Sequence, residues 1–88
     1  MLQTSQLRKN TETTCVMINC ESGSEGRIID EILEIKGVKE CVRTTGPYDI
    51  LAIIESHTVE SLKEIIENNI RKIPNVHATT TLVIATRF

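Results

Sequence analysis

An α+β fold of the split βαβ, or ferredoxin-like, class is predicted by three features of this 88-residue chain. Two segments carry isoleucine and leucine at helical spacing, and four shorter segments are rich in apolar and β-branched residues. Each helical segment lies between two strand segments, which gives the order βαββαβ. Because such crossovers are right-handed, both helices are expected on one face of a four-stranded antiparallel sheet.

The first half of this pattern follows a polar segment, residues 1–14, which we expect to be a flexible tail outside a domain of residues 15–88. Residues 15–20 read CVMINC and predict the first strand. Ser24 stands where a serine side chain caps a following helix. Gly37 stands where a glycine commonly ends one, so the first helix is expected between these two residues.

The second half repeats the pattern. Residues 38–45 and 49–55 predict two strands joined by a turn. Thr58 is the expected N-cap of the second helix, in which apolar residues recur at intervals of three, one and four residues. Pro74 stops this helix, and residues 77–87, rich in threonine and other β-branched side chains, predict the last strand.

The composition argues against several classes of function. The net charge is -2, from 10 basic and 12 acidic side chains, and no run of Lys or Arg exists to bind a phosphate backbone, so we expect no direct contact with nucleic acid. The longest apolar runs are too short to cross a bilayer. The three cysteines form no CxxC pair, so we expect reduced thiols in the cytoplasm, no metal site and no cofactor.

Both faces of the predicted sheet are apolar, although two helices cover only one of them. In the third strand Ile50, Ala52 and Ile54 point to one side, while Leu51 and Ile53 point to the other. Soluble monomers rarely expose an apolar patch of this size. We therefore expect a homodimer in which two sheets pack through their helix-free faces. The sequence leaves open which of the two sets of side chains faces the partner.

Four short motifs stand at the turns and on the last strand. In chain order they are Gly37-Val38, Gly46-x-Tyr48-Asp49, Pro74-Asn75-Val76 and Thr79-x-Thr81. Together, in this order and spacing, they resemble the effector-binding domain of the Lrp/AsnC family of regulators, also called the RAM domain. The resemblance covers residues 15–88.

This resemblance implies a regulatory domain that binds an amino acid in a cleft between dimers. The ligand residues that it implies are Gly46, Tyr48, Asp49, Thr79 and Thr81. Turn N–H groups and threonine hydroxyls would hold the ligand carboxylate, and the Asp49 carboxylate would accept hydrogen bonds from its ammonium group. The resemblance also implies a dimeric α/β barrel and rings of dimers, such as an octamer.

Full-length members of the family carry a DNA-binding helix-turn-helix before this domain. Residues 1–14 are too few to form one, so we expect a stand-alone effector domain that works through oligomerisation or with a DNA-binding regulator of the same family. Two residues also have purely structural interpretations. Asp49 would then cap its own turn, and Tyr48 would pack at a subunit contact without any ligand.

Two other functions stay open on the sequence alone. Small enzymes also use dimeric α/β barrels, but they need a positioned acid or base. Asp49, Tyr48 and two histidines are the only candidates here, and we assign no catalytic residue. The second alternative is an assembly subunit that binds no ligand.

Overall fold

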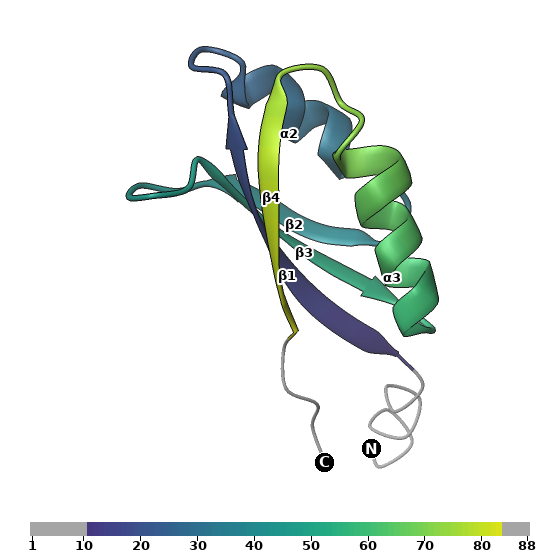
Figure 1. The fold of residues 1–88 in the computed structure, drawn as a ribbon. Coiled ribbons are helices and arrows are strands. Elements are labelled where there is room, and N and C mark those ends of the chain that lie inside the picture. Colours follow the sequence, from purple (N-terminus) through teal and green to yellow (C-terminus); the bar gives the residue numbers. More distant parts are fainter. Residues whose placement is uncertain (1–10, 84–88) are drawn as a thin grey trace.

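The computed structural model describes residues 11–83 and confirms the predicted βαββαβ order. Its four strands form one antiparallel sheet in the order β2-β3-β1-β4, and the helices cover one face of it (Figure 1). No helix within residues 11–83 is long and apolar enough to cross a membrane. The elements are β1 (Glu12–Cys20), α2 (Glu25–Leu33), β2 (Val38–Arg43), β3 (Ile50–Ser56), α3 (Val59–Ile65), the π-helical turn η1 (Ile66–Ile70) and β4 (Val76–Val83).

Strand β1 begins at Glu12, three residues before its predicted start. Thr14 is buried there, and its hydroxyl donates a hydrogen bond to the Leu82 carbonyl at 2.7 Å. Residues 12–14, expected in the polar tail, therefore belong to the sheet, because a threonine with a bonded hydroxyl can be buried at little cost. Residues 1–10 of the expected tail and residues 84–87 of the expected last strand lie outside the described residues.

The first helix starts as predicted but is shorter. Ser24 occupies its N-cap position without a side-chain hydrogen bond, and the Glu25 carboxylate instead accepts one from the Gly23 N–H. The helix ends at Leu33, before Gly37. Gly37 has a φ of +101° in the turn that follows, and its carbonyl accepts a hydrogen bond from Glu55 of β3 at 2.8 Å.

The second helix is capped as predicted and ends in a wider turn. The Thr58 hydroxyl accepts a hydrogen bond from the Ser61 N–H at 3.0 Å. In η1 the Arg71 N–H donates to the Ile66 carbonyl at 2.8 Å, which is an i→i+5 bond. Ile66 and Ile70 are both buried, so the wide turn still directs its apolar residues at the sheet.

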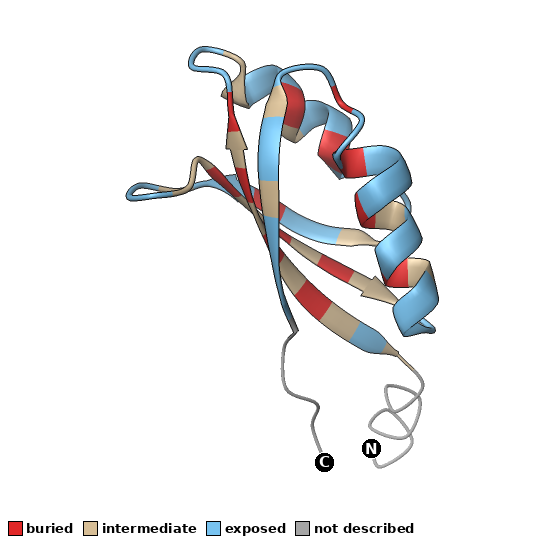
Figure 2. Cartoon of the chain, viewed as in Figure 1, coloured by how far each residue is buried: buried red, intermediate tan, exposed pale blue. Residues whose placement is uncertain are grey.

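The core lies between the helices and the sheet, and Figure 2 shows buried residues on the facing sides of both. Ile50, Ala52 and Ile54 are fully buried there, which assigns this set to the helix side. Leu51 and Ile53 point the other way and are only half-buried. We call the helix-free side the open face; its residues are Cys15, Met17, Asn19, Glu40, Val42, Leu51, Ile53, Ala78, Thr80 and Leu82.

Candidate functional site

The turn that carries the glycine-aromatic-aspartate motif lies between β2 and β3 and projects away from the helices (Figure 1). The Thr44 N–H donates to the Asp49 carbonyl at 3.0 Å, and the Thr44 hydroxyl donates to the Tyr48 carbonyl at 2.8 Å. Gly46 at its tip has a φ of +99°, and no atom would lie within 4 Å of a Cβ built there. The base of the turn is therefore fixed by hydrogen bonds, and its tip is open.

Asp49 fastens this turn to the end of β1. Its Oδ2 accepts a hydrogen bond from the Cys20 N–H at 2.9 Å, and its own N–H donates to the Ile18 carbonyl at 2.9 Å. The contact lies beside a register shift between Asn19 and Cys20 in the pairing of β1 with β4. Asp49 thus caps a neighbouring strand rather than its own turn. One carboxylate oxygen has this structural role, and the other makes no hydrogen bond within residues 11–83.

Tyr48 lies close to the last strand. Its hydroxyl is 3.4 Å from the Thr80 Oγ1, a long hydrogen bond across β1, which separates β3 from β4. Thr80 is paired with Met17 and belongs to the open face. The tyrosine side chain is half-buried, so it covers part of this face near the end of β1.

The two predicted threonines lie on the other side of the same strand. Thr79 is paired with Ile18 and Thr81 with Val16, and both of these partners are buried on the helix side. Since side chains alternate along a strand, the structure does not bring Thr79 or Thr81 together with Tyr48. It brings Thr80 there instead.

Two residues of this region were not predicted as site residues from the sequence. Thr80 lies between the two threonines of the motif, and Asn19 lies on the open face of β1, paired with Ala78 of β4. Alternation with the buried Ile18 and Cys20 is the signal that would have placed Asn19 on this face. We call Asn19, Tyr48, Asp49 and Thr80 the Tyr48 corner.

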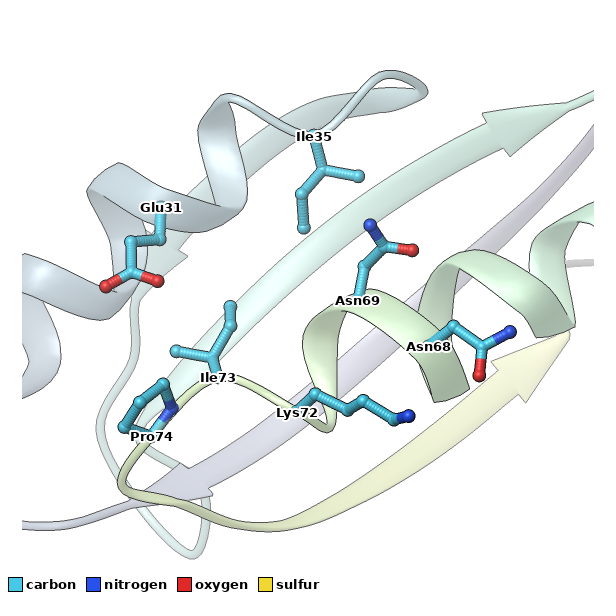
Figure 3. A pocket seen from close by; sticks show the side chains of 7 residues that line it. All are labelled: Glu31, Ile35, Asn68, Asn69, Lys72, Ile73 and Pro74. Atoms are coloured by element: carbon cyan, nitrogen blue, oxygen red, sulfur yellow. The ribbon is translucent and has the colours of Figure 1, made fainter.

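A separate hollow of about 290 Å³ lies on the helix side, between the C-terminal part of α2 on one side and η1 with the turn that follows it on the other (Figure 3). The side chains of Ile35 and Asn69 point toward one another across it. Arg27 bridges the two walls at one end, because its guanidinium contacts the Glu31 carboxylate at 2.8 Å and the Pro74 carbonyl at 3.0 Å. None of the predicted site residues borders this hollow, whose lining residues are Glu31, Ile35, Asn68, Asn69, Lys72, Ile73 and Pro74.

The three thiols are free and their environment keeps them protonated. Burial raises the pKa of Cys41 to about 11 and also raises the pKa of Cys15. The pKa of Cys20 is raised first by burial and then by the negative charge of Asp49. A protonated thiol is a poor nucleophile and a poor metal ligand. Among residues 11–83 there is also no cluster of three or more His, Cys, Asp or Glu side chains suited to a metal ion.

Several known proteins share this architecture. TTHA0845 from Thermus thermophilus superposes with a TM-score of 0.82 at 27% identity, over 88% of this chain and 96% of that protein. AsnC of E. coli gives 0.82 at 21% identity over 94% of this chain. The transcriptional regulator NMB0573 of Neisseria meningitidis, in complex with L-methionine, gives 0.78 at 10% identity over 98% of this chain. This chain spans only 56% of each of the latter two proteins.

Comparison at the level of sequence is more specific than the shared fold. No curated protein sequence matches this chain. The family model of the Lrp/AsnC ligand binding domain matches residues 13–88, which includes all of the motifs at the turns and on β4. The chain therefore belongs to the Lrp/AsnC ligand-binding domain family.

Proposed function

We propose that this chain is a regulatory domain that senses an α-amino acid and acts through its own assembly or on a DNA-binding regulator of the same family, in the cytoplasm. The observation that carries the proposal is the Tyr48 corner. It combines two hydroxyls, an amide and a carboxylate oxygen that has no hydrogen-bond partner among residues 11–83, at one end of a largely apolar face. A few convergent polar groups beside apolar surface are typical of small-ligand sites.

The chemistry of the corner suits a zwitterion. The Thr80 hydroxyl accepts the long hydrogen bond from Tyr48 and keeps its own proton to donate to a ligand carboxylate, and the second oxygen of Asp49 is an acceptor for an ammonium group. The N–H of Gly46, at the tip of the turn, would be a further donor. Met17 is paired with Thr80 at the border of the corner, so it would be the apolar side chain next to the ligand, while the rest of the open face packs against the second subunit. The complex of NMB0573 with L-methionine supports this class of ligand.

The open face supports a homodimer. Val42 and Leu82 are about half exposed, at 48% and 49%, and they flank the half-buried Met17, Leu51 and Ile53. Packing two such faces together as a dimeric α/β barrel removes this apolar surface from water. The turn that carries Gly46 projects from the sheet, so a ligand held there becomes enclosed only where a second dimer approaches. Rings of dimers, such as octamers, would provide that cleft.

Thr79 and Thr81 stay predicted ligand residues. They lie on the helix side of β4, which is an edge strand, so a ligand at the Tyr48 corner of the same chain is on the opposite side of the sheet. Their contribution would come from a neighbouring subunit that brings its own β4 close to the corner.

A ligand screen tests the proposal. The thermal stability of the chain is measured with each proteinogenic amino acid, because a ligand that binds only the folded state raises the apparent melting temperature. Calorimetry then compares the wild type, Asp49→Asn and the control Asp30→Asn, which removes an exposed carboxylate from α2. We expect Asp49→Asn to weaken binding by about 1.5–3 kcal/mol, roughly 10- to 150-fold, and Asp30→Asn to leave it unchanged.

Two results would contradict the proposal in different ways. If no amino acid raises the melting temperature, the chain is better described as an assembly subunit. If Asp49→Asn binds as tightly as the wild type, the ammonium group is held elsewhere and the Tyr48 corner is not its site.

A further inference from the structure

Arg27 of α2 makes three polar contacts on the helix side of the sheet. Its guanidinium donates to the Asn75 Oδ1 at 2.7 Å and to the Pro74 carbonyl at 3.0 Å, and it forms an ion pair with Glu31 at 2.8 Å. A guanidinium presents its N–H donors in a fixed plane, so it can hold several acceptors at once. We call these four residues the Arg27 clamp. The clamp ties α2 to the turn that leads into β4.

Asn75, which accepts one of these hydrogen bonds, has an unusual backbone conformation. Its φ is +77°, which lies in the left-handed region. This conformation is disfavoured for every residue except glycine, although asparagine tolerates it better than most. The bonds from Arg27 to the Asn75 side chain and to the preceding carbonyl are made in this shape of the turn, so they favour it over the alternatives.

The Asn75 carbonyl connects the clamped turn to the end of β1. It accepts a hydrogen bond from the Glu21 N–H at 2.9 Å. The preceding N–H, that of Cys20, points to the other side of the strand and donates to the Asp49 carboxylate at 2.9 Å. The end of β1 is thus held on one side by Asn75 and on the other by Asp49. The position of the Asp49 carboxylate therefore depends on that of Asn75.

A bulge follows directly after the clamped turn. The pairing of β4 with β1 leaves out His77, because its neighbours Val76 and Ala78 are paired with successive residues of β1. The His77 Nε2 lies 3.2 Å from the Glu21 carboxylate, and the Glu21 N–H is the group that binds the Asn75 carbonyl. The contacts that hold the turn therefore also hold the bulge.

The bulge decides which threonine faces Tyr48. With His77 as the extra residue, Thr80 lies opposite Met17 on the open face. If every residue of β4 were paired in turn, Thr79 would lie opposite Met17 and Thr80 would face the helix side. The hydroxyl that contacts Tyr48 is therefore placed by the start of β4, on the far side of the bulge.

We infer that Arg27 is a positioning residue of the Tyr48 corner, although it lies on the opposite side of the sheet. Through Asn75 it holds the end of β1, to which Asp49 is bound, and the start of β4, from which the position of Thr80 follows. The inference concerns the geometry of the corner. Its consequence for affinity rests on the proposed function, because a corner that is held less firmly would bind an amino acid less tightly.

Residue-resolved amide hydrogen exchange of the full chain tests the inference without a ligand. Arg27→Met keeps most of the side-chain length and removes the N–H donors, and Arg71→Met makes the same change at an exposed residue after η1. We expect the N–H groups of Glu21 and Cys20 to exchange about two- to fivefold faster in the first variant, the factor for an exposed charged contact, and at the wild-type rate in the second. The N–H of Cys15, farther from the turn on β1, should keep its wild-type rate in both.

The ring of Tyr48 gives a second readout, because it is the only tyrosine of the chain. If the clamp sets the position of Thr80, the NMR resonances of this ring shift in Arg27→Met and not in Arg71→Met. Asn75→Gly provides the rescue, since glycine adopts a positive φ readily without the help of Arg27. The double variant Arg27→Met/Asn75→Gly should therefore return both readouts toward the wild type.

Two results would overturn the inference. Unchanged exchange and unchanged Tyr48 resonances in Arg27→Met would show that the corner does not depend on the clamp. Exchange that rises by the same factor at Cys15, or a change that Asn75→Gly fails to reverse, would show a general contribution of Arg27 to stability instead. No amino acid enters these measurements, so the proposed function can fail while the positioning role of Arg27 stands, and the reverse.

Discussion

Replacing Asp49 by alanine isolates the structural role of its carboxylate. The change removes the acceptor of the Cys20 N–H, which lies at the end of β1 where the Cys20 residue is only 8% exposed. A buried donor left without a partner costs about 1–3 kcal/mol. For a domain of this size, each kcal/mol lowers the melting temperature by about 4–8 °C. We expect Asp49→Ala to lower it by roughly 5–20 °C.

Asp49→Asn provides the matched comparison. Its amide keeps a carbonyl oxygen that can accept the Cys20 N–H, so its melting temperature should fall by less than half as much. Circular dichroism at one fixed protein concentration measures both variants beside Asp30→Ala, which removes an exposed carboxylate far from the turn. If Asp49→Ala and Asp30→Ala have the same melting temperature, the hydrogen bond to Cys20 contributes nothing to stability and the turn is held by other contacts.

Further predictions concern the open face, the glycines, the buried thiol and nucleic acid. Leu51→Glu puts a charge on the open face, so light scattering should show monomers or unfolded chains for this variant and a dimer or a larger assembly for the wild type. A wild type that is monomeric at micromolar concentration would contradict the dimer. Gly46→Ala should lower the free energy of unfolding by about 1–2 kcal/mol, because Gly46 has a positive φ. Gly37→Ala should lower it by more, because Gly37 also has a positive φ and its new Cβ would lie 3.0 Å from the Glu55 carbonyl oxygen. Equal denaturant midpoints for the two variants would disprove this difference. Because the pKa of Cys41 is raised to about 11 in the folded state, the thiol loses its proton more readily when the chain is unfolded. The free energy of unfolding should therefore be constant below pH 9 and fall by at most about 1.4 kcal/mol per pH unit between pH 9 and 11. Urea titrations of Cys41→Ala should not show this fall. The chain alone should give no salt-sensitive shift of duplex DNA in a mobility assay.

The order and type of the elements follow from local patterns. Apolar spacing places both helices, and Thr58 caps the second one as its type and position indicate. The start of β1 does not follow from such patterns, because the burial of Thr14 depends on a hydrogen bond to Leu82, a residue 68 positions away. The π-helical turn at Ile66–Ile70 has no local signal that we recognise in the sequence.

In the candidate site, too, some features follow from local sequence and others depend on contacts between distant residues. Gly46, Tyr48 and Asp49 were expected in one turn, and the structure places them there. Which threonine faces Tyr48 depends on the register of β4 against β1, and that register shifts between Asn19 and Cys20. A shift of one position moves every side chain of a strand to the other face. The sequence motif alone therefore could not choose Thr80 over its neighbours.

The antiparallel pairing of β1 with β4 has a practical consequence for labelling. Thr14 lies opposite Val83, so the start of β1 and the end of β4 lie at the same end of the sheet. Cys20, and the turn that Asp49 connects to it, lie at the opposite end of β1. The first and last of the nine residues of β1 are about 27 Å apart. Two fluorophores, one attached at the start of β1 and one at the end of β4, would lie near one another, at the opposite end of the sheet from Cys20 and Asp49. Energy transfer between them would report unfolding of the sheet without a label on the turn that carries Tyr48 and Asp49.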